Sequence, residues 1–372
     1  MTTQTCRWLF LVTAVIVGVQ PVIAEDARIR IVFFTPQDVE PPANVPARMK
    51  QVVDYGQSFY GRWMQHWGYE PEHVLPVDRD GEGNPVIYYV RGSETAESGA
   101  YDKVGFQGQV REAAIAEHDI PRTGSTWWIF VYGTKLRASR GLGGHGDRKG
   151  NGLALLVWHD VAGELTDEVP LAGGIADRMN LKGYLHELGH TMSLPHIGPK
   201  ESLGLGMSLM GPNARTYRRV LSNREERVYL TPAVAALIWK QPQMTGVYDP
   251  ELKLPDVTLR GFRSTYDRRE KRITLRGRLS SDMEAHSVVG IDIPEEGPGD
   301  YWKKAYTSRL EEDGSFVLQI DELRPSSGVV KVVFCFENGV FTGTGDGVGF
   351  RHALEAPYRF ANGTYRVPRV RP

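Results

Sequence analysis

Residues 186 to 196 hold three histidines and one glutamate at a spacing that suits a metal centre. On a helix with 3.6 residues per turn, His186 and His190 lie on one face, so both imidazoles can reach one ion. Glu187 points to the side of that pair, where it can reach a water beside the ion without binding the ion itself. We therefore predict a hydrolytic metal centre with Glu187 as general base and zinc as the metal.

The third ligand is expected to be His196, which lies beyond Pro195. Proline cannot continue a helix and biases the preceding residue towards an extended conformation, so the chain has to turn before His196. Three protein ligands leave the fourth tetrahedral position open to water, which distinguishes a catalytic zinc from a structural one. Glu187 would take a proton from that water as it attacks a peptide carbonyl, and would then deliver the proton to the leaving amine.

These residues resemble the metzincin zinc peptidases, whose pattern is His-Glu-x-x-His-x-x-Gly-x-x-His followed by a turn that contains methionine. His186, Glu187, His190 and His196 fall on that pattern. The later run Ser-Leu-Met-Gly ends at residue 211, and its Met210 is similar to the methionine of the family's turn. The resemblance implies a zinc peptidase of the bacterial secreted type, acting on a peptide or protein substrate.

The resemblance also implies how the chain folds. It predicts an α/β catalytic domain over residues 25–250, in which a twisted mixed sheet carries the active-site helix. In metzincins an edge strand ahead of that helix binds the extended substrate by main-chain pairing, and here the corresponding region is residues 138–158. One departure is that the family's glycine falls on Ser193. A non-glycine residue with positive φ costs about 1 kcal/mol or somewhat more, so Ser193 puts the placement of His196 in question.

The N-terminus predicts export. Arg7 precedes an apolar run, and small residues near position 24 suit cleavage by a signal peptidase, so residues 1–24 are interpreted as a signal peptide. A membrane anchor is the alternative, but the run is short for a span and is broken at Gln20-Pro21. We expect a secreted or periplasmic protein without a membrane span in the mature chain.

Composition excludes some partners and one kind of cross-link. The chain of 372 residues has 44 basic and 45 acidic side chains and a formal net charge of −1, so neither nucleic acid nor an anionic membrane is indicated. Removal of the signal takes away Cys6 and leaves Cys335, which cannot form an internal disulfide. The 41% hydrophobic residues are typical of a globular chain with a substantial core.

Helix and strand patterns alternate through the first part of the chain, which predicts a mostly parallel sheet. Asp177 is the expected cap of the zinc helix, which should run from Met179 to Thr191. The other predicted strands are 28–35, 85–90, 127–132 and 153–158, and the other predicted helices are 46–67, 110–117 and 231–240.

From residue 256 onward the pattern changes to short alternating strands separated by Gly, Pro and Asp. The spacing predicts a small all-β sandwich over residues 256–372, with strands at 257–262, 272–279, 288–293, 315–320 and 329–336. Its role is either packing or the binding of substrate, a glycan or a cell surface through exposed Tyr301, Trp302 or Tyr306.

Some alternatives remain open. Residues 78–84 have the oxygen-rich side chains of a calcium loop, but they lack its distal glutamate and are more typical of a turn before a strand. The glycine-rich run 141–146 precedes no helix in the phosphate-binding arrangement, so we expect an edge segment near the cleft there. For the whole protein, the alternatives to a peptidase are a zinc hydrolase of a non-protein substrate and a binding or adhesion protein that retains the metal site.

Overall fold

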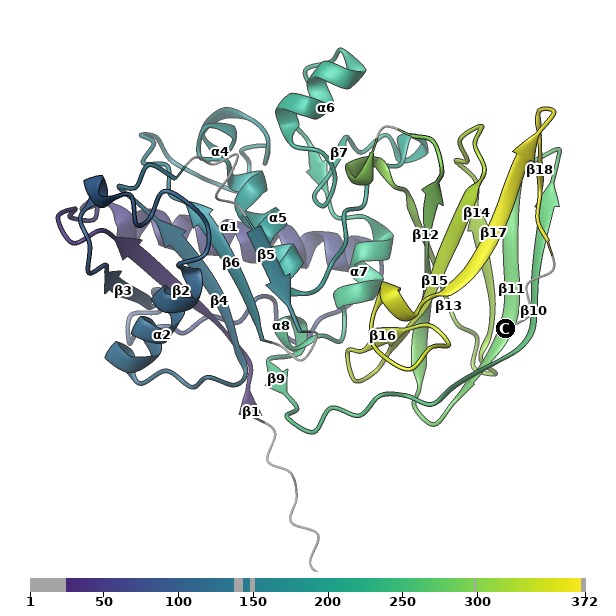
Figure 1. The fold of residues 1–372 in the computed structure, drawn as a ribbon, viewed down its shortest axis with the longest axis horizontal. Helices are drawn as coiled ribbons and strands as arrows, with labels where there is room; N and C mark the ends of the chain where they lie inside the picture. Colours follow the sequence, from purple (N-terminus) through teal and green to yellow (C-terminus); the bar gives the residue numbers. More distant parts are fainter. Residues whose placement is uncertain (1–24, 137–142, 148–150, 298, 369–372) are drawn as a thin grey trace, which may run out of the picture.

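The computed structural model describes residues 25–136, 143–147, 151–297 and 299–368. The predicted signal peptide, residues 1–24, lies outside the described residues, as does Cys6. The described chain has a mixed α/β fold, with an N-terminal half of helices around a twisted sheet and a C-terminal half built from antiparallel strands (Figure 1).

The N-terminal half is organised around a five-stranded sheet of order β3-β2-β4-β6-β5. Its first four members in that order pair in parallel, whereas β5 pairs antiparallel with β6 and ends the sheet. This confirms the prediction of a mostly parallel sheet. The strands are β2 (Arg28–Thr35), β3 (Ile87–Arg91), β4 (Ser125–Val131), β5 (Gly143–Gly146) and β6 (Gly152–Val157).

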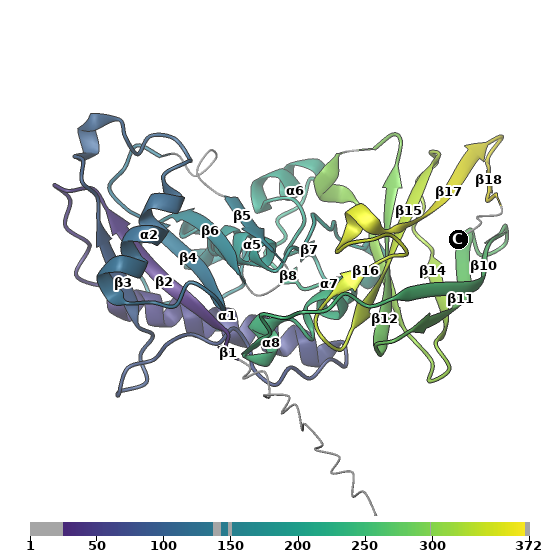
Figure 2. The same cartoon turned by 60° about the horizontal axis from the view of Figure 1, so that its bottom comes forward.

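Helices cover both faces of this sheet, which explains why its central strands are almost continuously apolar. Every residue of β4 is buried. Alternate residues such as Phe130 and Ile129 belong to core clusters on opposite faces. The helices α1 (Val45–His66) and α5 (Leu181–Thr191) pack on one face, and α2 (Gln107–His118) packs on the other, as the two views show (Figures 1 and 2).

The helix predicted to carry the zinc ligands is shorter than expected, because the chain breaks at Asn180. This residue has φ 60°, a left-handed conformation that separates α4 (Gly174–Arg178) from α5. Asp177 therefore lies inside α4 and does not cap α5. Its carboxylate instead accepts a hydrogen bond from Arg218 Nη1 at 2.9 Å.

The remaining elements of the N-terminal half are short and connect the larger ones. Thr231 caps α7, and its hydroxyl accepts from Val234 N–H at 3.2 Å. These elements are β1 (Glu25–Asp26), η1 (Ala96–Ser98), η2 (Glu201–Leu203), β7 (Met207–Ser208), α6 (Ala214–Leu221), β8 (Val228–Tyr229), α7 (Pro232–Ile238), α8 (Pro242–Thr245) and β9 (Val247–Tyr248).

The C-terminal half consists of two antiparallel sheets that enclose a second core cluster. One sheet has the order β10-β11-β14, and the other has the order β13-β12-β15-β17-β18 with β16 beside β15. All five predicted strands are present, some of them longer than expected. The strands are β10 (Val257–Asp267), β11 (Arg272–Ser281), β12 (Ala285–Pro294), β13 (Ala305–Arg309), β14 (Ser315–Ile320), β15 (Gly328–Phe336), β16 (Phe341–Thr342), β17 (Leu354–Ala361) and β18 (Thr364–Arg366), with the 3-10 turns η3 (Asp300–Trp302) and η4 (Phe350–His352).

The larger C-terminal sheet also packs against the N-terminal half. Its residues Val289, Ile291 and Val333 belong to the same core cluster as α1, α5 and α7, and Cys335 is a buried free thiol in that cluster. One hydrophobic core therefore crosses the expected boundary between residues 250 and 256. The division into a catalytic domain and a β-sandwich domain stays a prediction.

The exposure of three aromatic residues and the geometry of one loop test two of the predictions. Tyr301 is 43% exposed, but Trp302 and Tyr306 are only 9% and 3% exposed, so the prediction that all three are surface residues was wrong. In the loop 78–84, the Asp80 carboxylate accepts hydrogen bonds from the backbone N–H groups two and four residues ahead, which is the geometry of a turn.

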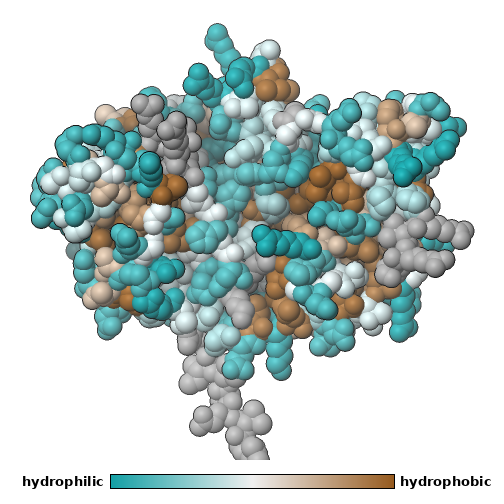
Figure 3. Space-filling model, in the orientation of Figure 1, coloured by the Kyte–Doolittle hydropathy of each residue, from teal (hydrophilic) through white to brown (hydrophobic). Residues whose placement is uncertain are grey.

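One face of the molecule is largely polar, with apolar side chains among the hydrophilic ones. Figure 3 shows hydrophilic and neutral residues over most of one face, with hydrophobic patches between them. Among the helices of the described residues, none combines the length and apolar character that a bilayer crossing requires.

A buried carboxylate in β12 leads to a prediction about stability and pH. Asp292 is 3% exposed and accepts a hydrogen bond from Tyr358 Oη at 2.6 Å. Burial raises the pKa of this carboxyl to about 6 from its usual 3.8. Between about pH 4 and pH 6 the folded state therefore binds more protons than the unfolded state, so stability falls as pH rises through that window.

Asp292→Asn should remove this penalty, because the neutral amide oxygen can still accept from Tyr358. We expect the variant to gain up to about 3 kcal/mol in unfolding free energy at pH 7.5, from a pKa shift of about two units. The gain should shrink towards pH 4. Urea unfolding of both proteins across this pH range measures the difference, and a gain that is independent of pH would contradict the assignment.

Candidate metal centre

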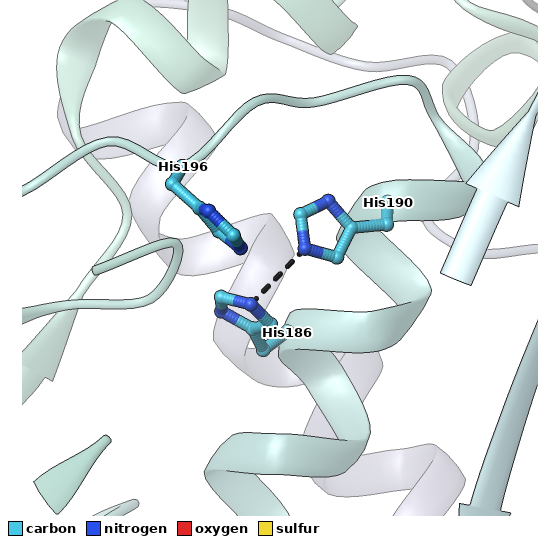
Figure 4. Close-up of side chains that lie close together, drawn as sticks. All are labelled: His186, His190 and His196. Atoms are coloured by element: carbon cyan, nitrogen blue, oxygen red, sulfur yellow. Dashed lines mark hydrogen bonds between the residues drawn. The ribbon is translucent and has the colours of Figure 1, made fainter. Parts of the chain in front are cut away.

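The three predicted ligands converge on one point at the C-terminal end of α5 (Figure 4). His186 and His190 project from the same face of the helix, and His196 reaches the same place from the loop that follows it. One ring nitrogen from each residue can be chosen so that all three atoms lie within 4.8 Å of one another. The three side chains can therefore hold a metal ion.

The other ring nitrogen of each histidine donates to an acceptor. His186 Nδ1 donates to Leu209 O at 2.8 Å, and His190 Nδ1 donates to Leu194 O at 2.7 Å. His196 Nδ1 lies 2.5 Å from a carboxylate oxygen of Asp300. In a neutral ring each of these bonds keeps the proton on Nδ1 and the lone pair on Nε2, which is the form that a metal needs.

The distance between two of these lone pairs supports a cation at the centre. His186 Nε2 and His190 Nε2 lie 3.1 Å apart (Figure 4). When both Nδ1 atoms carry the protons, neither Nε2 can donate to the other, so the two lone pairs repel unless a cation lies between them. Imidazole ligands of a tetrahedral zinc lie about 3.3 Å apart, which follows from bond lengths of about 2.0 to 2.1 Å. The donor set and spacing fit zinc.

Burial keeps the two helix histidines neutral. Burial lowers the pKa of His186 well below its usual value and lowers that of His190 as well. Because only a neutral imidazole can bind a metal, both residues are in the ligand form at neutral pH without a proton having to be displaced.

Glu187 lies on the same helix and is 9% exposed. Burial raises the pKa of its carboxyl to about 7, and the Lys182 ammonium one turn earlier opposes that shift. Lys182 is itself buried, and its Nζ donates to Leu209 O at 3.1 Å and lies 3.4 Å from Gly211 O. The lysine thus ties the start of α5 to the loop that contains Met210.

The segment around Met210 packs against the loop that contains His196. Met210 is fully buried, and a Cβ atom placed on Gly189 would lie only 2.6 Å from the Met210 sulfur. Ile197 N–H donates to Met210 O at 3.0 Å, and Ser208 Oγ donates to Ile197 O at 2.7 Å. Glycine at 189 therefore lets the methionine side chain reach the helix between the two ligand positions.

Ser193 adopts the conformation that the family's glycine usually supplies. Its φ is 58°, and α5 ends two residues earlier, so the chain turns here and brings His196 back to the centre. The Ser193 hydroxyl donates to Gly146 O of β5 at 3.0 Å. This bond offsets part of the cost of left-handed backbone at a residue with a Cβ atom.

The two effects can be separated by substitution. Ser193→Ala keeps the strained backbone and loses the hydroxyl, so it should destabilise the protein by about 1 kcal/mol. Ser193→Gly loses the same bond but relieves the strain, so it should stay within about 1 kcal/mol of the parent. Urea unfolding ranks the variants, and a glycine variant less stable than the alanine variant would contradict this account.

The edge strand β5 lies directly against α5 because it consists largely of glycine. A Cβ atom on Gly144 would come within 2.2 Å of Glu187 O, and one on Gly146 within 1.8 Å of Thr191 O. The predicted edge segment is thus an edge strand in its described part, and residues 137–142 and 148–150 lie outside the described residues. His145 of this strand is exposed.

A contribution from the C-terminal half was not predicted. The turn η3 places Asp300 on His196, and the Tyr301 ring stacks on the His196 ring with a centroid distance of 3.8 Å. Asp300 and His196 are 104 residues apart, so no local spacing could have revealed the pair. The signal in the sequence is the group of aromatic residues around Tyr301, which predicts a surface for an external ligand.

Comparisons with known proteins give structural neighbours only. No protein-family model matches the sequence, and no curated protein does. The fold is similar to two crystal structures of OgpA from Akkermansia muciniphila, of the wild type and of a catalytically inactive form in complex with an O-glycopeptide (glycodrosocin) substrate. Each has a TM-score of 0.66 at 20% sequence identity and covers 96% of this chain and 100% of OgpA. A second crystal form of wild-type OgpA gives 0.63 at 18% identity, over 92% and 97%. At this identity the likeness establishes the fold, in both halves of the chain.

Proposed function

We propose that this protein is a zinc-dependent endopeptidase of the metzincin type, with Glu187 as its general base and His186, His190 and His196 as the zinc ligands. The observation that carries the proposal is the convergence of three imidazole rings, each held by a bond at its Nδ1, beside a buried glutamate. When bound, zinc supplies Lewis-acid polarisation of a carbonyl and activation of water.

The residues of the chain supply proton transfer, support of the metal centre and substrate alignment. Glu187 takes a proton from the attacking water and returns it to the leaving amine. Met210 serves as the turn methionine, because it packs against Gly189 between the ligand positions. The backbone of β5 pairs with an extended substrate and aligns it along the ligand-bearing helix. A predicted signal peptide over residues 1–24 directs the enzyme out of the cytoplasm.

O-glycopeptides are the proposed substrate class. Support comes from OgpA, whose inactive form was crystallised with an O-glycopeptide substrate and whose fold matches nearly the whole chain. A glycine of strand β5 in this chain is consistent with such a substrate. Gly143 in β5 carries no side chain, and a Cβ on it would meet nothing within 4 Å, so this end of the strand leaves room beside a substrate for a bulky substituent.

The test is a comparison of matched substrates with the mature, zinc-loaded chain. A peptide O-glycosylated on one threonine, the same peptide without the sugar, and a set of small esters and amides are incubated and analysed by mass spectrometry. We expect cleavage of a peptide bond in the glycopeptide, with slower or no cleavage of the bare peptide. Cleavage of both peptides at equal rates would leave a peptidase but remove the glycopeptide preference. Turnover of the small esters or amides alone would favour the non-protein hydrolase, and no turnover with zinc bound would favour a binding protein.

A further inference from the structure

The turn η3 of the C-terminal half lies at the metal centre, although it is far from the ligand motif in sequence. Asp300 Oδ2 accepts from His196 Nδ1, the ring atom on the side away from the shared centre. The neighbouring Tyr301 ring covers His196 at a centroid distance of 3.8 Å and an angle of 28°. We propose that Asp300 is a positioning residue of the metal centre, so that the C-terminal half completes the site by fixing the third ligand.

The three ligands differ in what holds them, and this difference carries the inference. His186 and His190 sit on a helix, and their Nδ1 atoms donate to main-chain carbonyls of the N-terminal half. His196 lies on a loop and has a side-chain carboxylate as its Nδ1 partner. A charged acceptor gives a stronger and more directional bond than a neutral one, and it raises the basicity of the opposite nitrogen. The orientation of the ligand with the least local support therefore depends on Asp300.

The backbone beyond His196 is anchored to the same turn. Gly198 N–H donates to Lys303 O at 2.6 Å, and a Cβ atom on Gly198 would lie 2.7 Å from the Trp302 backbone. The Trp302 ring in turn stacks on Tyr217 with an angle of 8° between the planes. Together these contacts fix the position of η3 relative to the loop that contains His196.

Further along the loop, polar contacts continue the attachment. Lys200 Nζ binds Asp321 at 3.0 Å, and the Glu322 carboxylate accepts from Ser202 N–H at 3.0 Å. Lys304 also binds Glu322, at 2.5 Å. The loop from residue 196 to 203 is therefore held along its length by elements of the C-terminal half, and Asp300 is the charged member of this contact that touches a ligand.

The experiment measures zinc affinity rather than activity. Because the inference rests on the proposed zinc site, the wild-type mature chain is titrated first, in competition with a chelator of known affinity. Asp300→Ala should weaken zinc binding about 10- to 100-fold, as loss of an outer partner of a metal ligand typically does. The zinc affinity of Asp300→Asn should lie between those of the wild type and Asp300→Ala, because the amide oxygen can accept from His196 Nδ1 but carries no charge.

Asp321→Asn is the matched control. Asp321 has an exposure close to that of Asp300, 48% against 54% of the side chain, and it belongs to the same contact between the halves without touching a ligand. We expect its zinc affinity to stay within twofold of the wild type. Thermal unfolding with and without zinc gives a second readout. Asp300→Ala should melt like the wild type without metal and should lose part of the increase in Tm that zinc produces.

The outcomes distinguish the two claims. A wild-type chain that binds no zinc would overturn the metal centre and the role of Asp300 with it. A wild type that binds zinc alongside an Asp300→Ala variant of equal affinity would overturn the positioning role alone. A variant that melts lower without metal, and shows the full zinc increment, would assign Asp300 to packing and also overturn the inference.

Discussion

Glu187→Gln should reduce peptide hydrolysis by about 10²- to 10⁴-fold, the range that a positioned general base contributes, while zinc stays bound. Glutamine has the size of glutamate, and its amide cannot accept the proton of the attacking water. The three ligands and their Nδ1 partners are untouched by the change, so the metal content should remain at the wild-type level. Values of kcat/KM on a cleaved peptide, together with metal analysis of the same samples, measure both effects.

Glu201→Gln is a suitable control for this substitution. Glu201 begins η2 on the loop that follows the third ligand, and it is exposed, so the same chemical change is made close to the centre but outside it. It should leave kcat/KM nearly unchanged. A Glu187→Gln enzyme that cleaved at the parental rate would remove Glu187 from its proposed role, whatever the metal content showed.

His190→Ala should abolish both zinc binding and hydrolysis. The residue supplies one of the three proposed ligand nitrogens, so its removal leaves two imidazoles, and the loss of affinity should exceed the 10- to 100-fold typical of an outer partner. Metal analysis after gel filtration should show the loss of one equivalent of zinc. In the same preparation the Glu187→Gln protein should retain it, which separates binding from chemistry.

His145→Ala provides the comparison for the ligand test. His145 lies on β5 beside the same helix, but it is exposed and does not belong to the converging triad. We expect this variant to keep its zinc. Equal loss of zinc from the His145 and His190 variants would mean that the metal binds elsewhere or that the helix has been disturbed.

The triad was predictable because its geometry is local. Spacing of four residues on a helix places His186 and His190 together whatever the rest of the chain does, and Pro195 forces the turn before His196. The structure brings all three together as expected. Sequence reasoning also identified Ser193 as the residue whose backbone would decide the outcome, and its φ of 58° shows that serine takes the glycine conformation.

Features set by distant contacts were not predictable in the same way. The break at Asn180 depends on one left-handed residue inside an otherwise helical pattern, so periodicity extended the helix too far. Trp302 and Tyr306 resemble surface aromatics in sequence, but Trp302 is buried against the ligand loop and Tyr306 in the core of the C-terminal half. Asp300 belongs to the same group, because its partner is brought to it only by the packing of the two halves.

The glycine-rich strand β5 fixes the distance between itself and the helix α5. Its main chain touches the main chain of α5 at Gly144 and Gly146, with no side chain as a spacer. A rotamer change cannot alter that separation, and neither can a conservative substitution, since even alanine would force the strand outward. The strand and the helix therefore behave as one rigid part. For any chain that pairs with β5, the distance to the three histidines is set by backbone atoms alone.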